Sequence, residues 1–128
     1  MTNLRRIAAA VATVALAAAL LAVAAAAHTT ATKKLTGVVG KNDAYKITLK
    51  DASGKLVKTL KAGTYTIVIH DDSAAHNYEL DGPKGKSWTF TSVSFTGTKT
   101  IKLKLVAGKY KAYCAPHESL MFQHFTVK

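Results

Sequence analysis

The stretch IKLKLVAGKYKAYC, residues 101–114, indicates how this chain folds. Over residues 101–105, isoleucine and leucine alternate with lysine, so every second side chain is apolar. That period of two is typical of a β-strand with one face in a core and the other in solvent. Residues 107–109 contain a glycine and predict a turn, after which a second strand pattern runs up to Cys114. We therefore expect two consecutive strands, with Cys114 at the end of the second.

Runs of the same kind occur along the rest of the chain from residue 35 onward. They are rich in Val, Ile, Thr, Tyr and Phe, and they stop at clusters of turn residues such as 51–54 and 81–85. Besides the two strands above, we expect strands at residues 45–50, 56–60, 65–69, 88–90, 93–95 and 122–127. We expect no long helix after residue 27. Seven to nine short strands at this spacing predict an all-β fold, an antiparallel sandwich or barrel.

The first 27 residues differ in composition from the rest of the chain. A short basic segment, residues 1–6, precedes an apolar run over residues 7–27 that ends in four alanines. This is the pattern of a helical, cleaved signal peptide, although about 20 apolar residues are also enough for a retained membrane anchor. We expect a signal peptide at 1–27, a polar flexible leader at 28–34 and one domain at 35–128. The protein is then exported, to the periplasm, the cell envelope or the extracellular space.

The chain is strongly basic, with a formal net charge of +11. Without Arg5 and Arg6, the remainder has 16 lysines and seven acidic residues, a net charge of +9. Scattered lysines, the absence of arginine after the signal peptide and the expected export all argue against nucleic-acid binding. Two interpretations stay open: a solvated surface, or attraction to an acidic partner or an anionic envelope surface.

The only cysteine lies in a segment rich in soft metal ligands. In YCAPHESLM, residues 113–121, a thiol, an imidazole and a thioether come from Cys114, His117 and Met121. A second imidazole, His76, lies upstream where a β-fold could bring it alongside. Two imidazoles, a thiolate and a weak thioether form the ligand set of a type 1 copper site. A buried structural cysteine is the alternative, but a free thiol in an oxidising compartment is open to oxidation, which favours a metal that holds the thiolate.

Two segments, residues 108–121 and 69–83, resemble the plastocyanin/azurin family of cupredoxins, and are most similar to small bacterial plastocyanin-like domains. The resemblance implies a Greek-key β-sandwich that binds one type 1 (blue) copper ion. It implies that His76, Cys114 and His117 form a trigonal plane and that Met121 is the axial ligand.

The same resemblance implies a function: a monomeric single-electron carrier that cycles between Cu(I) and Cu(II) and is not an enzyme. Its partner is then a redox protein, which we expect to carry an acidic docking surface because this chain is basic. Two alternatives remain. The chain could be an envelope copper carrier or buffer that uses the same ligands, or a metal-free interaction sandwich.

The resemblance also implies roles for residues around the ligands. The Asn77 amide is expected to tie the His76 loop to the cysteine loop. Pro116 has no amide N–H, so it cannot donate a hydrogen bond to the thiolate, and it stiffens the loop. Tyr110 matches the tyrosine-corner position and is expected to be structural. By strand alternation Tyr113 points outward, either on an electron path to Cys114 or simply as a solvent-facing tyrosine.

Some features depart from the family pattern. Many relatives have a glycine soon after the methionine, and no glycine follows Met121. The chain must therefore leave the loop by another course, and the alternative for Met121 is a core methionine. We expect His70 to be a hydrogen-bonded structural residue. His124 is either a surface histidine or a competing ligand.

Overall fold

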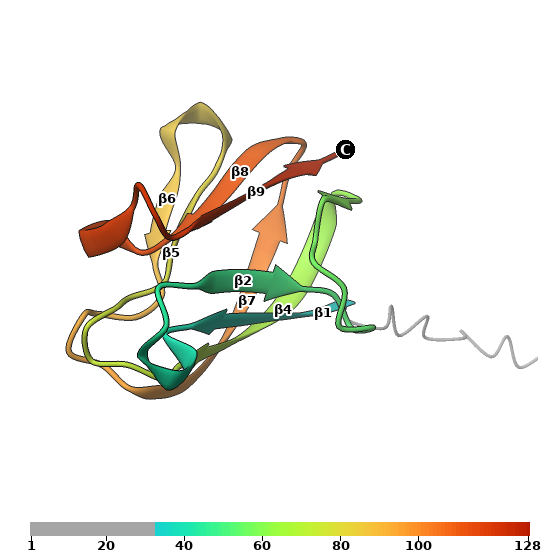
Figure 1. Cartoon of the computed structure of the whole chain (residues 1–128). Coiled ribbons are helices and arrows are strands. Elements are labelled where there is room, and N and C mark those ends of the chain that lie inside the picture. Colours follow the sequence, from blue (N-terminus) through green and yellow to red (C-terminus); the bar gives the residue numbers. More distant parts are fainter. Residues whose placement is uncertain (1–32) are drawn as a thin grey trace, which may run out of the picture.

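Residues 33–128 are described by a computed structural model and form two β-sheets that pack against each other (Figure 1). The predicted signal peptide and residues 28–32 of the predicted leader lie outside this range. The last two leader residues, Lys33 and Lys34, already belong to the first strand. Within residues 33–128, no helix is long and apolar enough to cross a membrane.

The nine strands divide into a sheet of four and a sheet of five. The first sheet has the order β2-β1-β4-β7, made of Ile47–Lys50, Lys33–Val39, Gly63–Asp71 and Gly97–Leu105. The second has the order β3-β9-β8-β5-β6, made of Thr59–Leu60, Phe122–Val127, Gly108–Tyr113, Glu79–Asp81 and Ser87–Thr89. Three short 3-10 turns complete the described part: η1 (Lys41–Asp43), η2 (Pro83–Gly85) and η3 (Ala115–His117).

The connections give the sandwich its Greek-key character. The chain passes from one sheet to the other five times, including the connections from β4 to β5 and from β7 to β8, while β4 pairs with β7 and β5 pairs with β8. The expected all-β sandwich is thus confirmed, and its strand number falls in the predicted range. The sheets are mixed and not purely antiparallel, because β1 runs parallel to β4 and β3 runs parallel to β9.

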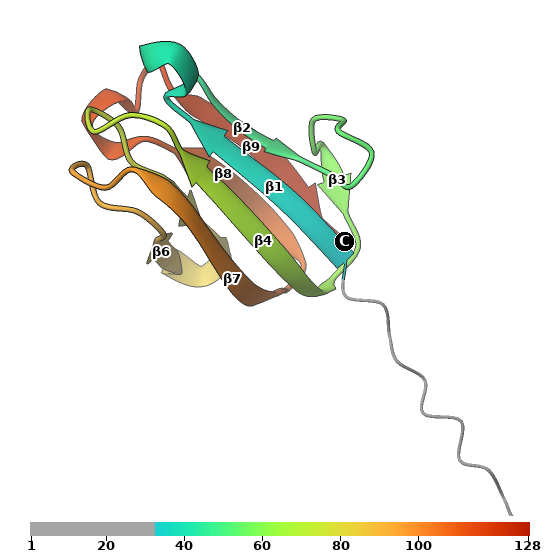
Figure 2. The ribbon, with the colours of Figure 1, turned by 90° about the horizontal axis from the view of Figure 1, so that it is seen from below.

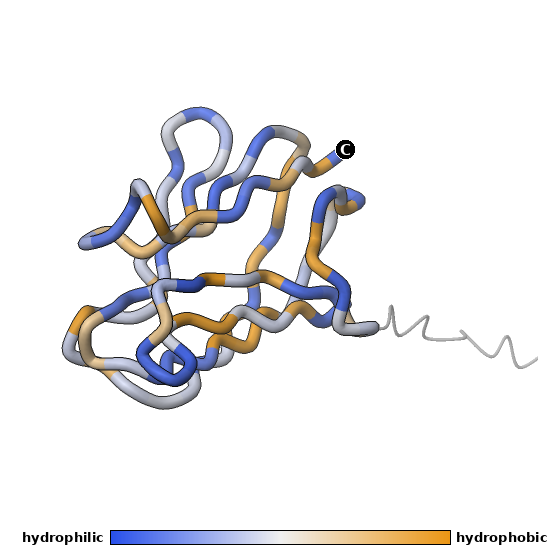
Figure 3. The backbone as a smooth tube through the Cα atoms, in the orientation of Figure 1, coloured by the Kyte–Doolittle hydropathy of each residue, from blue (hydrophilic) through white to orange (hydrophobic). Residues whose placement is uncertain are grey.

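Strand alternation places the core between the two sheets. In β7 the lysines at 102 and 104 are exposed, Leu105 is fully buried, and Ile101 and Leu103 are half-buried. Figure 3 shows hydrophilic and hydrophobic residues interspersed along the strands. The predicted strand at 93–95 is wrong: this segment bends instead, and the Phe95 N–H donates to the Ser92 carbonyl.

Two loops far apart in sequence meet at one end of the sandwich. Glu79, the first residue of β5, pairs with Tyr113, the last residue of β8. The loop that precedes β5 therefore lies beside the loop that follows β8. The turn after β1 lies at this end too, and Figure 2 shows η1 and η3 there together. This is the end that carries the candidate metal ligands.

Candidate metal centre

Three of the predicted ligands come from the two loops that meet at this end. His76 lies in the loop between β4 and β5, Cys114 follows β8 directly, and His117 ends the η3 turn. The 3-10 turn keeps the two downstream ligands close, because the His117 N–H donates to the Cys114 carbonyl at 3.1 Å. The pairing of β5 with β8 supplies the long-range step that brings His76 to them.

The ligand atoms converge on one point. His76 Nδ1 and His117 Nδ1 are 3.1 Å apart, and each is 3.7 Å from Cys114 Sγ. A point equidistant from the corners of this triangle lies about 2.0 Å from each atom, close to the Zn–N distance of about 2.0–2.1 Å and the Zn–S distance of about 2.3 Å in zinc proteins. The spacing therefore suits a transition-metal ion without large movement of the side chains.

The chemistry of this group selects soft and borderline metals. Two imidazoles and one thiol supply two nitrogen donors and one sulfur donor, a set that favours copper over calcium or magnesium. Among residues 33–128, it is the one group of three or more His, Cys and acidic residues whose ligand atoms lie this close together. The His-Cys-His group fits a type 1 copper site. The cupredoxin resemblance of the sequence is thus confirmed in the two-sheet sandwich and in this group.

Comparisons with known proteins add only weak likenesses. No family model matches the chain. No curated protein sequence matches it either. A solved structure of an oxidised amicyanin mutant is similar with 16% identity and a TM-score of 0.47, over 73% of this chain and 80% of that one. Amicyanin from Paracoccus versutus (Thiobacillus versutus) is similar with 17% identity and a TM-score of 0.40, over 73% and 79% of the two chains. Likenesses at this level do not establish a function.

The three ligand side chains differ in how deeply they are buried. Cys114 and His76 are 0% and 2% exposed, whereas His117 is half-buried. The centre is therefore enclosed by the protein except on the side of His117. Water therefore reaches the thiol poorly, and His117 is the most exposed of the three ligands.

Met121 closes the ligand loop through its backbone. Its carbonyl accepts from the Cys114 N–H at 3.1 Å, and its N–H donates to the His117 carbonyl at 2.8 Å. The side chain is 1% exposed and belongs to the same buried core cluster as Cys114. β9 begins at the next residue, Phe122, which shows how the chain leaves the loop without a glycine. The axial role of Met121 stays a prediction.

The Asn77 side chain forms a hydrogen bond between the two loops. The Ala115 N–H donates to Asn77 Oδ1 at 2.8 Å, and the Asn77 backbone N–H lies 3.5 Å from Cys114 Sγ. Pro116 lies at the centre of η3 between Ala115 and His117. Asn77 is 3% exposed, so its contact to the sulfur is buried, whereas its hydrogen bond to the exposed Ala115 is partly buried.

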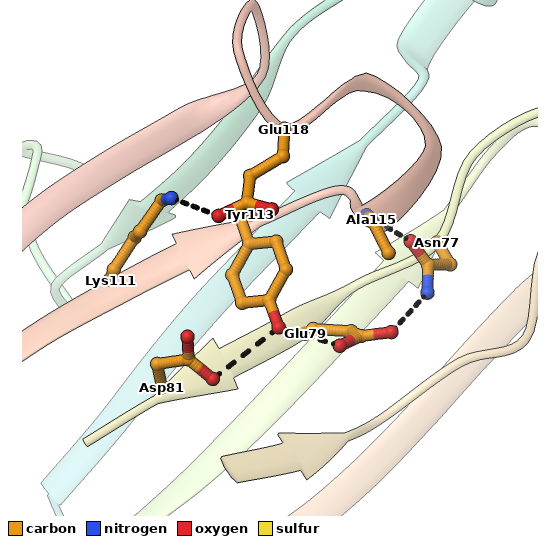
Figure 4. Close-up of polar contacts among 7 residues, drawn as sticks. All are labelled: Asn77, Glu79, Asp81, Lys111, Tyr113, Ala115 and Glu118. Carbon is orange, nitrogen blue, oxygen red and sulfur yellow. Dashed lines mark hydrogen bonds and ion pairs between the residues drawn. The ribbon is translucent and has the colours of Figure 1, made fainter. Parts of the chain in front are cut away.

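Tyr113 lies on the outer face of its sheet, but it does not face solvent. It is 9% exposed, and its hydroxyl donates to Glu79 Oε2 at 2.8 Å and approaches Asp81 Oδ1 at 3.4 Å (Figure 4). Burial, followed by the hydrogen bond to Glu79, raises the pKa of Tyr113 to about 12. Of the two alternatives for this residue, the solvent-facing tyrosine is not what the structure has, because neighbouring β5 places two carboxylates against the hydroxyl. The electron path stays a prediction.

Tyr110 points into the core on the opposite face. It is 2% exposed, and its hydroxyl donates to the Val106 carbonyl at 3.0 Å, while the Val106 N–H donates back to the hydroxyl at 3.1 Å. The ring stacks on Phe125 at a centroid distance of 5.1 Å. This structural role is the one expected for the residue.

The two remaining histidines of the described part lie outside the metal group. His70 Nδ1 is hydrogen-bonded to Thr98 Oγ1 at 3.0 Å across the β4–β7 pair, in agreement with the structural role we expected. His124 packs edge-on against Phe122 at 5.4 Å on β9. It therefore acts as a surface residue and not as a competing ligand in this structure.

Sequence reasoning missed one residue that touches the centre. Tyr45 packs edge-on against both histidine rings, with centroid distances of 5.2 Å to His76 and 4.7 Å to His117. It is 60% exposed, so it forms an outer cover over the two rings. No local signal could have revealed this, because Tyr45 begins an ordinary alternating run and lies 31 residues from His76.

Proposed function

We propose that this protein binds one type 1 copper ion and carries single electrons between redox partners. His76, Cys114 and His117 would hold the ion through two imidazole nitrogens and the thiolate, with Met121 as the weak axial ligand. The observation that carries the proposal is the convergence of His76 Nδ1, His117 Nδ1 and Cys114 Sγ, separated by 3.1 and 3.7 Å. Copper in such a site supplies a one-electron couple, Cu(I)/Cu(II).

Rigidity of the ligands favours electron transfer over catalysis. A thiolate suits Cu(I) and an imidazole suits Cu(II), so a site with both serves the two states with little movement. The Asn77 contact to Ala115 and the backbone hydrogen bonds that join Met121 to Cys114 and to His117 would hold the ligands in place beforehand. Because Cys114 and His76 are buried, the centre offers little room for a substrate, and we propose that the protein is not an enzyme.

We propose that redox partners approach at His117. Three apolar side chains near this end are strongly exposed: Tyr45 at 60%, Leu120 at 70% and Phe122 at 47%. They line one shallow groove. Three lysines, Lys41, Lys46 and Lys50, line a neighbouring pocket. Apolar contact at short range and positive charge at longer range suit a partner with an acidic docking surface, and the charge would raise the rate of encounter at low salt.

The location and domain division remain proposals as well. Residues 1–27 would direct export and be removed, and residues 28–128 would act as a monomer in the periplasm, the cell envelope or outside the cell. The lysine-rich surface could also hold the protein near anionic envelope polymers. N-terminal sequencing of the protein from a producing cell tests the cleavage directly.

An optical spectrum tests the metal site. Purified protein with one equivalent of Cu(II) should show intense absorption near ~600 nm from thiolate-to-copper charge transfer. The Cys114→Ser variant should lose the band while keeping the fold. A colourless 1:1 complex would refute the type 1 assignment. Fast electron self-exchange with slow copper loss to a chelator supports the electron carrier, whereas rapid copper loss supports a copper buffer.

A further inference from the structure

Two neighbours hold the side chain of Asn77 in one orientation (Figure 4). Its Oδ1 accepts from the Ala115 backbone N–H at 2.8 Å, and its Nδ2 donates to Glu79 Oε1 at 2.8 Å. A backbone N–H only donates and a carboxylate only accepts, so a flipped amide would lose both bonds. Ala115 and Glu79 therefore demand the same orientation of the Asn77 amide, and Glu79 holds the end that faces away from Ala115.

Glu79 is itself held on its other side. Its Oε2 accepts from the Tyr113 hydroxyl at 2.8 Å, and the two residues are directly paired on β5 and β8. Because Tyr113 is 9% exposed, water competes poorly for this bond. One carboxylate oxygen of Glu79 thus accepts from Asn77 and the other accepts from Tyr113, which leaves the carboxylate little freedom to rotate away from Asn77.

These contacts form a chain that begins and ends beside Cys114. It runs from the Tyr113 side chain through Glu79 and Asn77 to the Ala115 backbone, one residue on either side of the cysteine. The Asn77 backbone N–H adds a contact of 3.5 Å to the sulfur itself. A change in the position of Asn77 must therefore move both the donor to the sulfur and the backbone that carries it.

We propose that Glu79 is a positioning residue for the metal centre, acting through Asn77. This inference rests on the proposed copper site, but Glu79 touches none of the proposed ligands. Partners hydrogen-bonded directly to a metal ligand typically change metal affinity by about 10–100-fold when they are lost. Because Glu79 lies one contact further out, behind Asn77, we expect its loss to have an effect at the lower end of that range.

Three variants distinguish the positioning role of the Glu79 side chain from the effect of its negative charge. Glu79→Ala removes both acceptors. Glu79→Gln keeps a carbonyl oxygen for Asn77 and can donate its amide to the Tyr113 oxygen, so it preserves the chain without the charge. Asp81→Ala is the matched control, because Asp81 lies 3.4 Å from the same tyrosine hydroxyl and no hydrogen bond joins it to Asn77.

The experiment measures Cu(II) affinity by chelator competition and records the charge-transfer band of each purified variant. We expect Glu79→Ala to bind Cu(II) about tenfold more weakly with a shifted band, and Glu79→Gln to stay within about threefold of the unaltered protein. Asp81→Ala should match the unaltered protein. Equal losses in Glu79→Ala and Glu79→Gln, or an equal loss in Asp81→Ala, would show that charge and not positioning is responsible, and would overturn the inference.

A second measurement needs no copper. In the metal-free protein, Glu79→Ala should speed hydrogen exchange of the Ala115 amide by about tenfold, because its acceptor is no longer held, and Glu79→Gln should not. Unchanged exchange in Glu79→Ala overturns the inference. If the unaltered protein gives no charge-transfer band, the proposed function fails, and the exchange rates still decide whether Glu79 positions Asn77.

Discussion

Replacing Gly40 with alanine tests whether the turn after β1 holds His76 in place. Gly40 has φ 67° and ψ 22°, a left-handed conformation that costs an alanine about 1–2 kcal/mol. A Cβ at this position would lie 2.6 Å from Ser73 Cβ and 2.9 Å from His76 Cδ2. Overpacking of this kind costs about 1–3 kcal/mol more. We therefore expect Gly40→Ala to lower the free energy of unfolding by about 2–5 kcal/mol.

Gly54 supplies a matched control for the cost of placing an alanine in a left-handed backbone conformation. Its φ is 80°, but nothing lies within 4 Å of the Cβ that an alanine would add. Gly54→Ala should therefore show only the conformational cost, about 1–2 kcal/mol. Urea unfolding of the metal-free proteins measures both changes from the midpoint and the slope of the transition. The difference between the two variants isolates the contact with Ser73 and His76.

Copper affinity provides the second readout of the same pair. Because the added carbon in Gly40→Ala presses on the His76 ring, this variant should bind Cu(II) more weakly, whereas Gly54→Ala should bind it normally. Equal losses of stability in the two variants would refute the packing argument. A destabilised Gly40→Ala that keeps its full copper affinity would refute the claim that this turn sets the position of His76.

Three further perturbations address the fold, a buried carboxylate and the axial position. Gln123 joins β9 to the β2 region through three hydrogen bonds, one from the Leu49 N–H at 2.8 Å and two to the Leu49 and Val57 carbonyls at 3.0 and 2.9 Å. Gln123→Ala should therefore cost about 2–4 kcal/mol in urea unfolding, against almost nothing for His124→Ala on the same strand. Asp71 is 1% exposed with Oδ2 unpaired, and burial raises its pKa, so the folded state favours the protonated acid. The protonated Asp71 stabilises the fold below the unfolded-state pKa of about 4, and this contribution is lost as the pH rises through the folded-state pKa. At pH 7 the Asp71→Asn protein should therefore be more stable than the unaltered protein, and at low pH this advantage should disappear. Met121→Gln should keep the charge-transfer band and lower the reduction potential in voltammetry, and an unchanged potential would exclude an axial Met121.

Much of the candidate site could be predicted because its chemistry is local. Cys114 and His117 are three residues apart, so a single 3-10 turn brings them together, and Cys114 ends a strand recognisable from its alternation. The cupredoxin resemblance added His76 from the His-Asn pair. The position of Met121 in the loop was predictable in the same way, whereas the distance of its sulfur from the centre depends on how the loop packs.

The errors have a common physical cause. The segment 93–95 has strand-like composition, but no neighbouring strand accepts its hydrogen bonds, so it bends. Alternation placed Tyr113 on the outer face correctly, yet it could not show that Glu79 and Asp81 lie against its hydroxyl there. A strand's composition reports which of its faces is apolar, and it carries no information about which side chains a neighbouring strand supplies.

The amino-acid sequence alone determined the all-β class, the alternation that separates core from surface, and the kinds of ligand present. These are properties of residues close together in the chain, where the strand period and the chemistry of each side chain are sufficient. The tertiary structure decided that both histidines present Nδ1, that Tyr45 covers their rings, and that Glu79 holds Asn77. These contacts depend on the register of β5 against β8 and on the meeting of loops more than 30 residues apart, which only the packing of the two sheets establishes.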